Sequence, residues 1–353
     1  MARKRKTLPK DFQEMLTSAP LEELKAVFGK CELDARGGYA KGTAIGFPEC
    51  PDELVVWLSE QGLAVDTPDG DGRTPLHTRA SRGVPKQIPL LLSLGADIEA
   101  VDKAGKTPLL TAVGRLRSAP ARVLIEHGAS TEVLDKSGES LLKRALVITR
   151  NIDLPECVEI AKLLLEHGTS VTAEMRREVE RIGRDFEFHR GNFNSDLFGK
   201  TDAALGELYG IFGVEPVARR SRHDGVSPIV VPDGSWQERH KALWELLVPS
   251  SGAGETVQCE AIRVTGRITD EMFRNGGANW DRDYRAMADA FPGFLAQGEP
   301  LGEEELQEAK EIAKEVRSGR GADGHLDRMS ELAVAWVARN PAPIALGAVD
   351  YTR

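Results

Sequence analysis

Apolar residues recur at helical spacing through most of the chain, in short stretches that turn residues separate. One stretch contains Leu54, Val55 and Leu58, and leucine runs at 90–92 and 163–165 mark two more. Steps of three and four place such side chains on one face of a helix. Gly and Pro residues stand between the stretches and favour tight turns there. The pattern predicts an all-α chain of short helices.

Glycines repeat with a fixed step in the first half of the chain. Gly72, Gly105 and Gly138 lie 33 residues apart. Two further sets keep the same step: Asp69, Asp102 and Asp135, and Gly62, Gly95 and Gly128. Three sets in register indicate an internal structural repeat, as in a stacked array of similar units.

Each unit carries signals for where its helices begin and end. Thr74 can cap a helix with its hydroxyl, and Pro75 stands at the first helical position, where a missing N–H costs nothing. Leu76 and Ala80 then face inward. A second apolar helix ends at Gly95, where a left-handed backbone is wanted. The unit is therefore a pair of short helices with a turn.

This unit resembles the ankyrin repeat. The family signature, Thr-Pro-Leu-His-x-Ala followed by Leu-Leu-x-x-Gly-Ala, is matched at 74–80 and 90–97, with Ala80 one residue later than the signature places it. The next unit has Leu110 where the family has His. The resemblance covers residues 43–172. It implies an all-α solenoid of about four units whose turn tips and first helices form a concave, protein-binding surface without catalytic chemistry.

The ends of the array and one insertion complete its outline. Gly128 and Gly168 are 40 residues apart, so seven extra residues fall near 149–155, between two helices. The first helix of the earliest unit is expected to start near Thr43. Amphipathic stretches within 12–28 and 174–212 predict capping helices at the two ends. The array with its caps is expected to occupy residues 1–213.

Contacts with a partner are expected from charged residues at the turn tips, because signature residues are structural. The candidate partner-binding residues are Asp69, Asp71, Arg73, Asp102, Lys103, Lys106, Asp135, Lys136 and Glu139. The alternative for each is a solvated turn residue. His77, His127 and His167 occupy positions typical of the family, which predicts structural hydrogen bonds and no metal or catalytic role.

The net charge of −9 is unevenly distributed. Residues 1–173 carry −1, and residues 174–353 carry −8. An acidic half disfavours nucleic acid as a partner and makes a basic protein partner electrostatically easier. A narrower hypothesis is a bacterial immunity protein that neutralises a cognate toxin.

Cysteine usage and hydropathy bear on the compartment. The four cysteines lie far apart, without zinc-ligand spacing, and are expected to be reduced and mostly buried. The basic start of the chain leads into polar residues, and no apolar run is long enough for a membrane span. We therefore expect a cytoplasmic protein with no membrane, metal or cofactor.

The second half begins with a stretch rich in Pro and Gly at 214–234, which is expected to be a linker. It contains a basic cluster of Arg219, Arg220 and Arg222. From Ser235, placed three residues before Glu238 as in a capping box, apolar stripes predict a series of helices to about residue 340. Residues 235–353 are expected to form an all-α domain.

Polar residues gather around one glycine-containing turn of this domain. The possible pocket consists of Glu260, Arg263, Arg267, Asn275, Asn279, Asp281, Asp283 and Tyr284. Such a set could line a catalytic or ligand site, with the array as scaffold, or could form a salt-linked surface. An enzyme predicts a deep cleft there, and a binding protein predicts exposed or paired groups. The sequence lacks the Gly-rich nucleotide motifs and common hydrolase motifs, so no catalytic residue is assigned.

Overall fold

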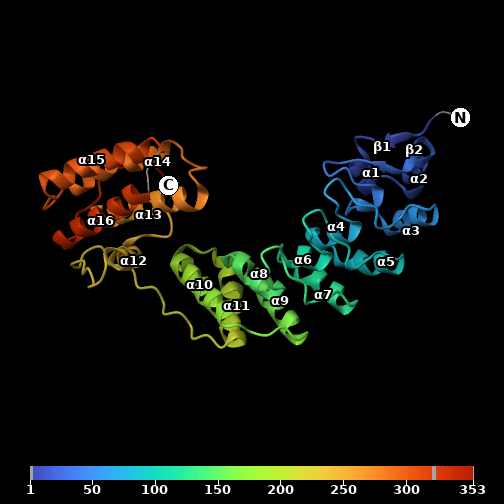
Figure 1. Cartoon of the computed structure of the whole chain (residues 1–353), viewed down its shortest axis with the longest axis horizontal. Coiled ribbons are helices and arrows are strands. Elements are labelled where there is room, and N and C mark those ends of the chain that lie inside the picture. Colours follow the sequence, from blue (N-terminus) through green and yellow to red (C-terminus); the bar gives the residue numbers. More distant parts are fainter. Residues whose placement is uncertain (1–2, 320–322, 353) are drawn as a thin grey trace. The chain divides into compact units, whose positions relative to one another are not determined.

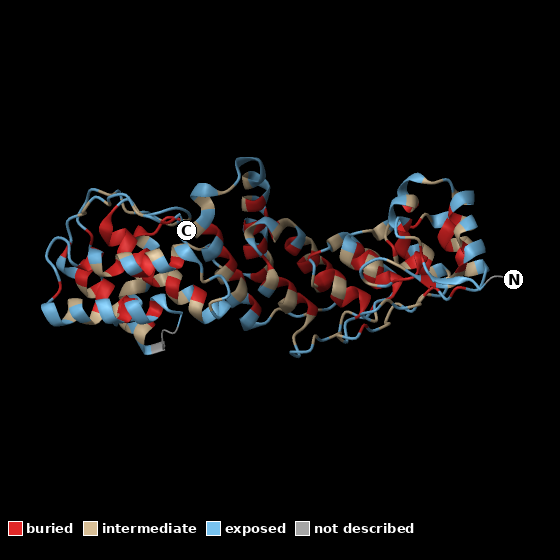
Figure 2. Ribbon diagram, turned by 90° about the horizontal axis from the view of Figure 1, so that it is seen from above, coloured by how far each residue is buried: buried red, intermediate tan, exposed pale blue. Residues whose placement is uncertain are grey.

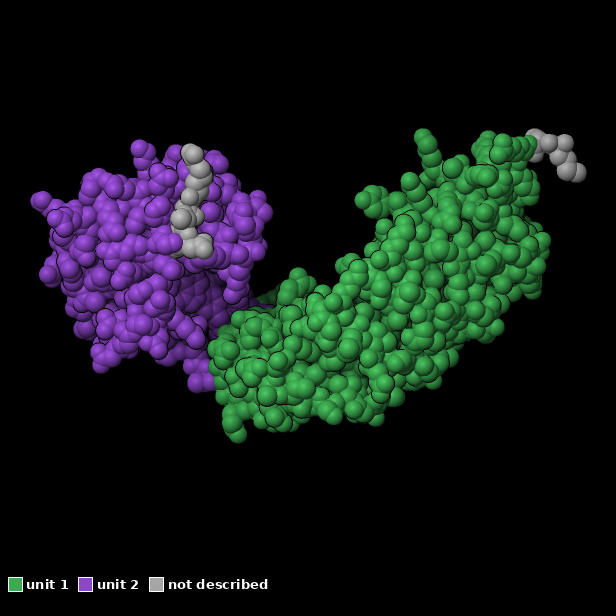
Figure 3. Space-filling model, viewed as in Figure 1, with its two compact units in different colours: residues 1–186, 194–217 green, residues 187–193, 218–353 purple. Residues whose placement is uncertain are grey.

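A computed structural model of the chain describes residues 3–319 and 323–352. The chain divides into two compact units (Figure 3). Unit 1 comprises residues 1–186 and 194–217, and unit 2 comprises residues 187–193 and 218–353. Among the described residues, no helix has the length and apolar character that crossing a membrane requires.

Unit 1 begins with two helices and a strand pair. Helices α1 (Phe12–Ser18) and α2 (Leu21–Lys30) confirm the predicted N-terminal cap. Strand β1 (Arg5–Thr7) pairs in parallel with β2 (Cys31–Arg36), which the sequence did not predict. Neither strand has an alternating apolar pattern, because β1 is a short, exposed and mostly basic segment.

Paired helices follow in the order that the repeat predicts. They are η1 (Ala44–Gly46), α3 (Asp52–Glu60), α4 (Pro75–Arg82), η2 (Pro85–Gln87), α5 (Ile88–Ser93), α6 (Pro108–Val113), α7 (Ser118–Glu126), α8 (Leu141–Ile148), η3 (Asn151–Asp153) and α9 (Leu154–Glu166). The first helices α4, α6 and α8 pack in one row, and α5, α7 and α9 form the other (Figure 1). Buried side chains line the inner faces of these helices (Figure 2). The insertion at 149–155 forms η3 and the start of α9, as a lengthened connection.

The expected first helix near Thr43 is the exception. The structure has only the single 3₁₀ turn η1, because Gly46, Pro48 and Pro51 interrupt the segment. Arg79 of α4 reaches toward this segment and is fully buried, at the position where the family signature has Ala.

Arg79 is held through Gln87. Its Nε donates to Gln87 Oε1 at 2.8 Å, and Gln87 Nε2 donates to the Cys50 carbonyl at 2.7 Å. The terminal nitrogens of Arg79 are buried and have no hydrogen-bond partner in the described part of the chain. Burial lowers the pKa of Arg79 to about 10, so its charge persists at neutral pH. We infer that the long side chain occupies volume that a complete first helix would otherwise fill.

Two long helices close the array. They are α10 (Ala173–His189) and α11 (Ser195–Phe212), joined through η4 (Arg190–Asn192). α11 packs on α9. Both helices extend beyond the predicted bounds because polar, salt-linked turns, such as Arg181 with Glu178 and Asp185, continue α10.

Unit 2 is helical, as predicted. Its helices are α12 (Trp236–Leu247), α13 (Val257–Asn275), α14 (Arg282–Leu295), α15 (Glu303–Arg317) and α16 (Asp323–Arg339). α13 lies centrally and packs against α12, α14 and α16. Ser235 and Glu238 form the predicted capping box at the start of α12. Phe291 and Trp336 are fully buried in the core.

The segment expected to be a linker packs on unit 2 over much of its length. Ile229 is buried in the core, and its N–H donates to the Pro341 carbonyl at 2.7 Å. Arg220 donates to the carbonyls of Trp244, Glu245 and Val248. Composition alone did not indicate these contacts, because they depend on single side chains that find partners in the helical core.

The buried Arg79 yields a stability prediction. Arg79→Ala should lower the free energy of unfolding of unit 1 by about 2–4 kcal/mol, because it leaves a cavity beside η1. Arg79→Met keeps most of the packing volume and should recover about 1–2 kcal/mol of that loss. Denaturant titration followed by circular dichroism measures both. Exposed Arg82→Ala is the matched control, with an expected change within about 0.5 kcal/mol. Equal stability of the Ala and Met variants would show that packing is not the role of Arg79.

Candidate functional site

Three hairpins of the same construction project from the repeats. In each, the N–H of the aspartate donates to the carbonyl four residues on, at 2.9–3.0 Å: Asp69 to Arg73, Asp102 to Lys106 and Asp135 to Glu139. The glycines that follow the tips have positive φ angles: +80° at Gly72, +71° at Gly105 and +74° at Gly138. These angles explain the spacing of 33 residues, because side-chain-bearing residues rarely adopt them.

The aspartate carboxylates close their own hairpins. Asp102 Oδ1 accepts from the N–H groups of Ala104 and Lys106 at 2.8 and 2.9 Å. The carboxylates of Asp69 and Asp135 accept from their own hairpins in the same way. Asp102 is also buried, with 9% of its surface exposed. A partner-binding role for these three carboxylates remains a prediction, and their structural role competes with it.

Neighbouring hairpins are joined by backbone hydrogen bonds. The N–H of Lys103 donates to the Asp71 carbonyl at 3.0 Å, and the Lys103 ammonium donates to the Gly70 carbonyl at 2.6 Å. The N–H of Gly70 in turn donates to the Ala40 carbonyl at 2.7 Å. Ala40 belongs to an additional hairpin, closed by the bridge between Gly37 and Gly42. The hairpins therefore form a continuous row.

His77 connects a first helix to the next hairpin. The N–H of Thr74 donates to His77 Nδ1 at 3.2 Å, so the proton lies on Nε2, which donates to the Lys106 carbonyl at 2.7 Å. Burial lowers the pKa of His77, which favours this neutral form. His127 and His167 contact backbone carbonyls within their own helices. These contacts confirm the predicted structural role of the three histidines.

A groove lies between the first hairpins and α4. Its cavity measures about 260 Å³, and its lining includes Tyr39, Phe47, Asp71, Arg73, Ser81 and Arg82. Tyr39 is completely exposed at the tip of the additional hairpin. Sequence reasoning missed Tyr39 and Arg82. The 33-residue register carried one step upstream of Gly72 leads to Tyr39 and could have identified it.

The remaining predicted contact residues lie along the same row. Arg73, Lys103, Lys106 and Lys136 are exposed, whereas Glu139 is half-buried and pairs with Lys143 at 3.1 Å. Arg115 follows α6 as Arg82 ends α4, 33 residues earlier. We call the surface made by these cations and Tyr39 the hairpin face: Tyr39, Arg73, Arg82, Lys103, Lys106, Arg115 and Lys136.

The possible pocket of unit 2 is closed by internal pairing. Glu260 and Arg263 are fully buried and form an ion pair at 2.7 Å. The Tyr351 hydroxyl donates to Glu260 Oε1 at 2.7 Å, and the N–H of Gly254 donates to Oε2. Burial opposes the charge of Arg263, but its hydrogen bonds to Glu260 raise its pKa above the ordinary value. These two groups therefore face each other and not a cleft.

The other members of this set have structural partners too. Glu271 accepts from the side chains of Asn275 and Asn279, which closes the glycine turn. Asp281 caps α14 by accepting from the N–H of Tyr284.

Further contacts hold the segment after α16 and the aromatic side of α14. Asp283 accepts from Thr352, and Tyr284 stacks on Trp280. The buried Nε of Arg267 has no partner among the described residues. The structure does not gather these side chains around one cavity.

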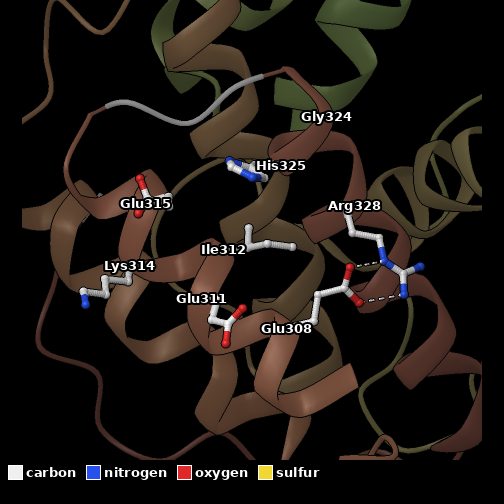
Figure 4. Close-up of a pocket in the computed structure, with 8 residues that line it drawn as sticks. All are labelled: Glu308, Glu311, Ile312, Lys314, Glu315, Gly324, His325 and Arg328. Carbon is white, nitrogen blue, oxygen red and sulfur yellow. Dashed lines mark hydrogen bonds and ion pairs between the residues drawn. The ribbon is translucent and has the colours of Figure 1, made fainter. Parts of the chain in front are cut away.

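The largest cavity, about 550 Å³, lies between α15 and α16 (Figure 4). Arg328 pairs there with Glu308 at 2.9 Å and with Glu331 at 2.8 Å. The pair lowers the pKa of Glu308 and raises that of Arg328. The charges of this cavity thus neutralise one another. In the described part of the chain, no three His, Cys, Asp or Glu side chains are grouped as metal ligands.

The four cysteines are free and buried, as predicted. Burial raises the pKa of Cys50 and of Cys259 to about 12, and that of Cys157 to about 11. A thiol that stays protonated at neutral pH is a poor nucleophile. None of these three residues is therefore suited to nucleophilic catalysis.

Comparison with known families agrees with the geometry of unit 1. The family model for ankyrin repeats, in three copies, matches residues 44–135, about a quarter of the chain. The chain is thus an ankyrin-repeat protein over this region. No curated protein matches it.

Contact between hairpins predicts a difference between two glycines. A Cβ at Gly72 would lie 2.9 Å from the backbone nitrogen of Lys103, whereas one at Gly138 would meet nothing within 4 Å. Both residues have positive φ, so both Ala variants lose about 1 kcal/mol from backbone strain. Gly72→Ala should lose at least about 1 kcal/mol more. Denaturant titration measures the difference, and equal losses would mean that the hairpins are not tightly stacked.

His240 predicts a pH dependence for unit 2. Burial lowers its pKa from 6.5 to about 4, and its Nε2 lies 2.8 Å from Thr265 Oγ1. The neutral ring is favoured in the fold, so its contribution to stability is complete above pH 6.5 and is lost as the pH falls toward 4.

His240→Gln should therefore flatten the decline of stability over this interval. Four of the five tryptophans lie in unit 2, so tryptophan fluorescence during urea titration reports on it. His127→Gln, in unit 1, is the control. An unchanged slope in the His240 variant would contradict the assignment.

Proposed function

We propose that unit 1 binds a partner protein through the hairpin face, without catalysing a reaction on it. Ankyrin repeats indicate a protein-interaction module. The observation that carries the proposal is the hydrogen-bonded row of hairpins, which holds exposed, variable side chains on a rigid support. Such preorganisation lowers the ordering cost of binding.

Tyr39 is a candidate anchor for this interaction. Tyrosine is enriched among the residues that dominate interface energies, because it offers a large rigid surface and a hydrogen-bonding hydroxyl. Here it stands fully exposed beside a groove that Phe47 and Arg82 also line. A partner side chain that enters the groove would contact the tyrosine ring and the first repeat together.

The alternative, an enzyme or ligand-binding domain in unit 2, has less support. Its strongest candidate residues, Glu260 and Arg263, are paired with each other and shielded by Tyr351. Paired, buried groups are the arrangement expected of a structural network. This observation favours the binding role over the enzymatic one.

A narrower form of the proposal is a cytoplasmic immunity protein of bacterial type that neutralises a toxin. It rests on the resemblance to free-standing ankyrin proteins and on the −8 charge of residues 174–353, which suits a basic partner. The free, buried cysteines suit a reducing compartment. Co-expression with a captured partner tests this form: rescue from the partner's toxicity supports it, and absence of toxicity contradicts it.

The proposed face is tested by affinity capture with matched variants. Tyr39→Ser combined with Arg115→Ala removes exposed side chains without disturbing a hydrogen bond that the structure shows. Capture of a specific protein should fall by about tenfold or more, since interface anchors contribute about 2 kcal/mol or more. Lys200→Ala combined with Lys241→Ala, exposed residues on α11 and α12, is the control. Equal capture by both variants would contradict the proposed face.

A further inference from the structure

Cations on the hairpin face lack acidic partners. Arg82, Lys106, Arg115 and Lys136 are exposed, and none forms an ion pair in the described part of the chain. Elsewhere in unit 1 arginines are neutralised: on α10, Arg181 pairs with two carboxylates. The unpaired charge is therefore a property of this face and not of the whole unit.

The acidic residues of the same row are already engaged. The carboxylates of Asp69, Asp102 and Asp135 accept backbone N–H groups of their hairpins. Asp71 lies 3.5 Å from Arg73, and Glu139 pairs with Lys143. Although the chain as a whole is acidic, the charge that remains available on the hairpin face is positive.

Exposed apolar side chains accompany these cations. Tyr39 is completely exposed, and Val101 and Leu134 are 63% and 57% exposed. Val101 and Leu134 directly precede Asp102 and Asp135, so they recur with the repeat. Large apolar side chains exposed at regular steps along a rigid support suit contact with another polypeptide.

We propose that the hairpin face takes an acidic polypeptide segment that carries apolar side chains. This inference rests on the proposed function and specifies its partner. Carboxylates of the segment would pair with Arg82, Lys106 and Arg115, and its apolar side chains would contact Tyr39 and the residues before the hairpins.

A polypeptide is favoured over a nucleic acid for two reasons. A phosphate backbone requires a dense field of cations, and here aspartates alternate with the cations in a chain of net charge −9. The exposed aliphatic side chains also have no role in contacts with phosphate. The charge of this face thus selects a different partner from the basic one that the charge of the second half favours.

The partner chemistry is tested by selecting binders from a random peptide library displayed on phage, with the full chain as bait. The charge-reversal variant combines Arg82→Glu, Lys106→Glu and Arg115→Glu. The matched control combines Lys200→Glu, Lys241→Glu and Lys310→Glu, which changes the net charge equally at exposed lysines outside the face. Selected peptides are then synthesised, and their affinities are measured by fluorescence anisotropy.

The selected peptides should be enriched in Asp and Glu together with Leu, Val or aromatic residues. The charge-reversal variant should weaken binding by about tenfold or more, and the control by less than about twofold. Raising the salt concentration from about 50 mM to about 300 mM should weaken binding as well, because exposed charge pairs are screened.

Three outcomes would overturn the inference, and they separate it from the proposed function. Neutral or basic peptides that lose binding in the charge-reversal variant would disprove the acidic partner and leave the binding face intact. Peptides that bind both variants equally, or no selected binder at all, would contradict the proposed function too. Displacement of the peptide by single-stranded DNA at equal concentration would assign the face to nucleic acid.

Folding of the variants is measured separately. Circular dichroism and thermal unfolding should match the native chain within a few degrees. A milder set, Arg82→Gln, Lys106→Gln and Arg115→Gln, removes the charges without reversing them. It should weaken acidic peptides less than the Glu set does, and an effect equal to that of the control would count against the inference.

Discussion

The structure of unit 1 depends on the closed hairpin at the start of each repeat. A single aspartate carboxylate accepts two backbone N–H groups and thereby replaces the strand neighbours that a short turn lacks. Hydrogen bonds from Lys103 to Asp71, and from His77 to the Lys106 carbonyl, then connect one repeat to the next. Because these bonds use backbone atoms, the exposed side chains of the row are free to vary without loss of the fold.

The same construction separates structural charge from available charge. Counting residues suggests turn tips of mixed sign, with aspartates among the contact candidates. The hydrogen bonds remove those carboxylates from the balance and leave the neighbouring cations unpaired. The electrostatic character of the face therefore follows from local geometry and differs from the net charge of the chain.

The sequence predicted those parts of the fold that repeat or that follow local rules. The spacing of the glycines located the hairpins, and Ser235 with Glu238 located the start of α12. It did not predict η1, because one interrupted unit has no periodic signal of its own, or the burial of Arg79, which depends on the volume left beside η1. The paired state of Glu260 was also beyond reach. Tyr351, 91 residues later, completes its hydrogen bonding, and no local pattern connects the two.

Hydrogen–deuterium exchange of the full chain, with and without its captured partner, tests the central claim most directly. The account predicts that partner binding slows exchange at 37–42, 69–73, 102–106 and 135–139, the segments of the hairpin row, and in the first helices that follow them. Protection confined to unit 2, or to the second helices α5, α7 and α9, would contradict it.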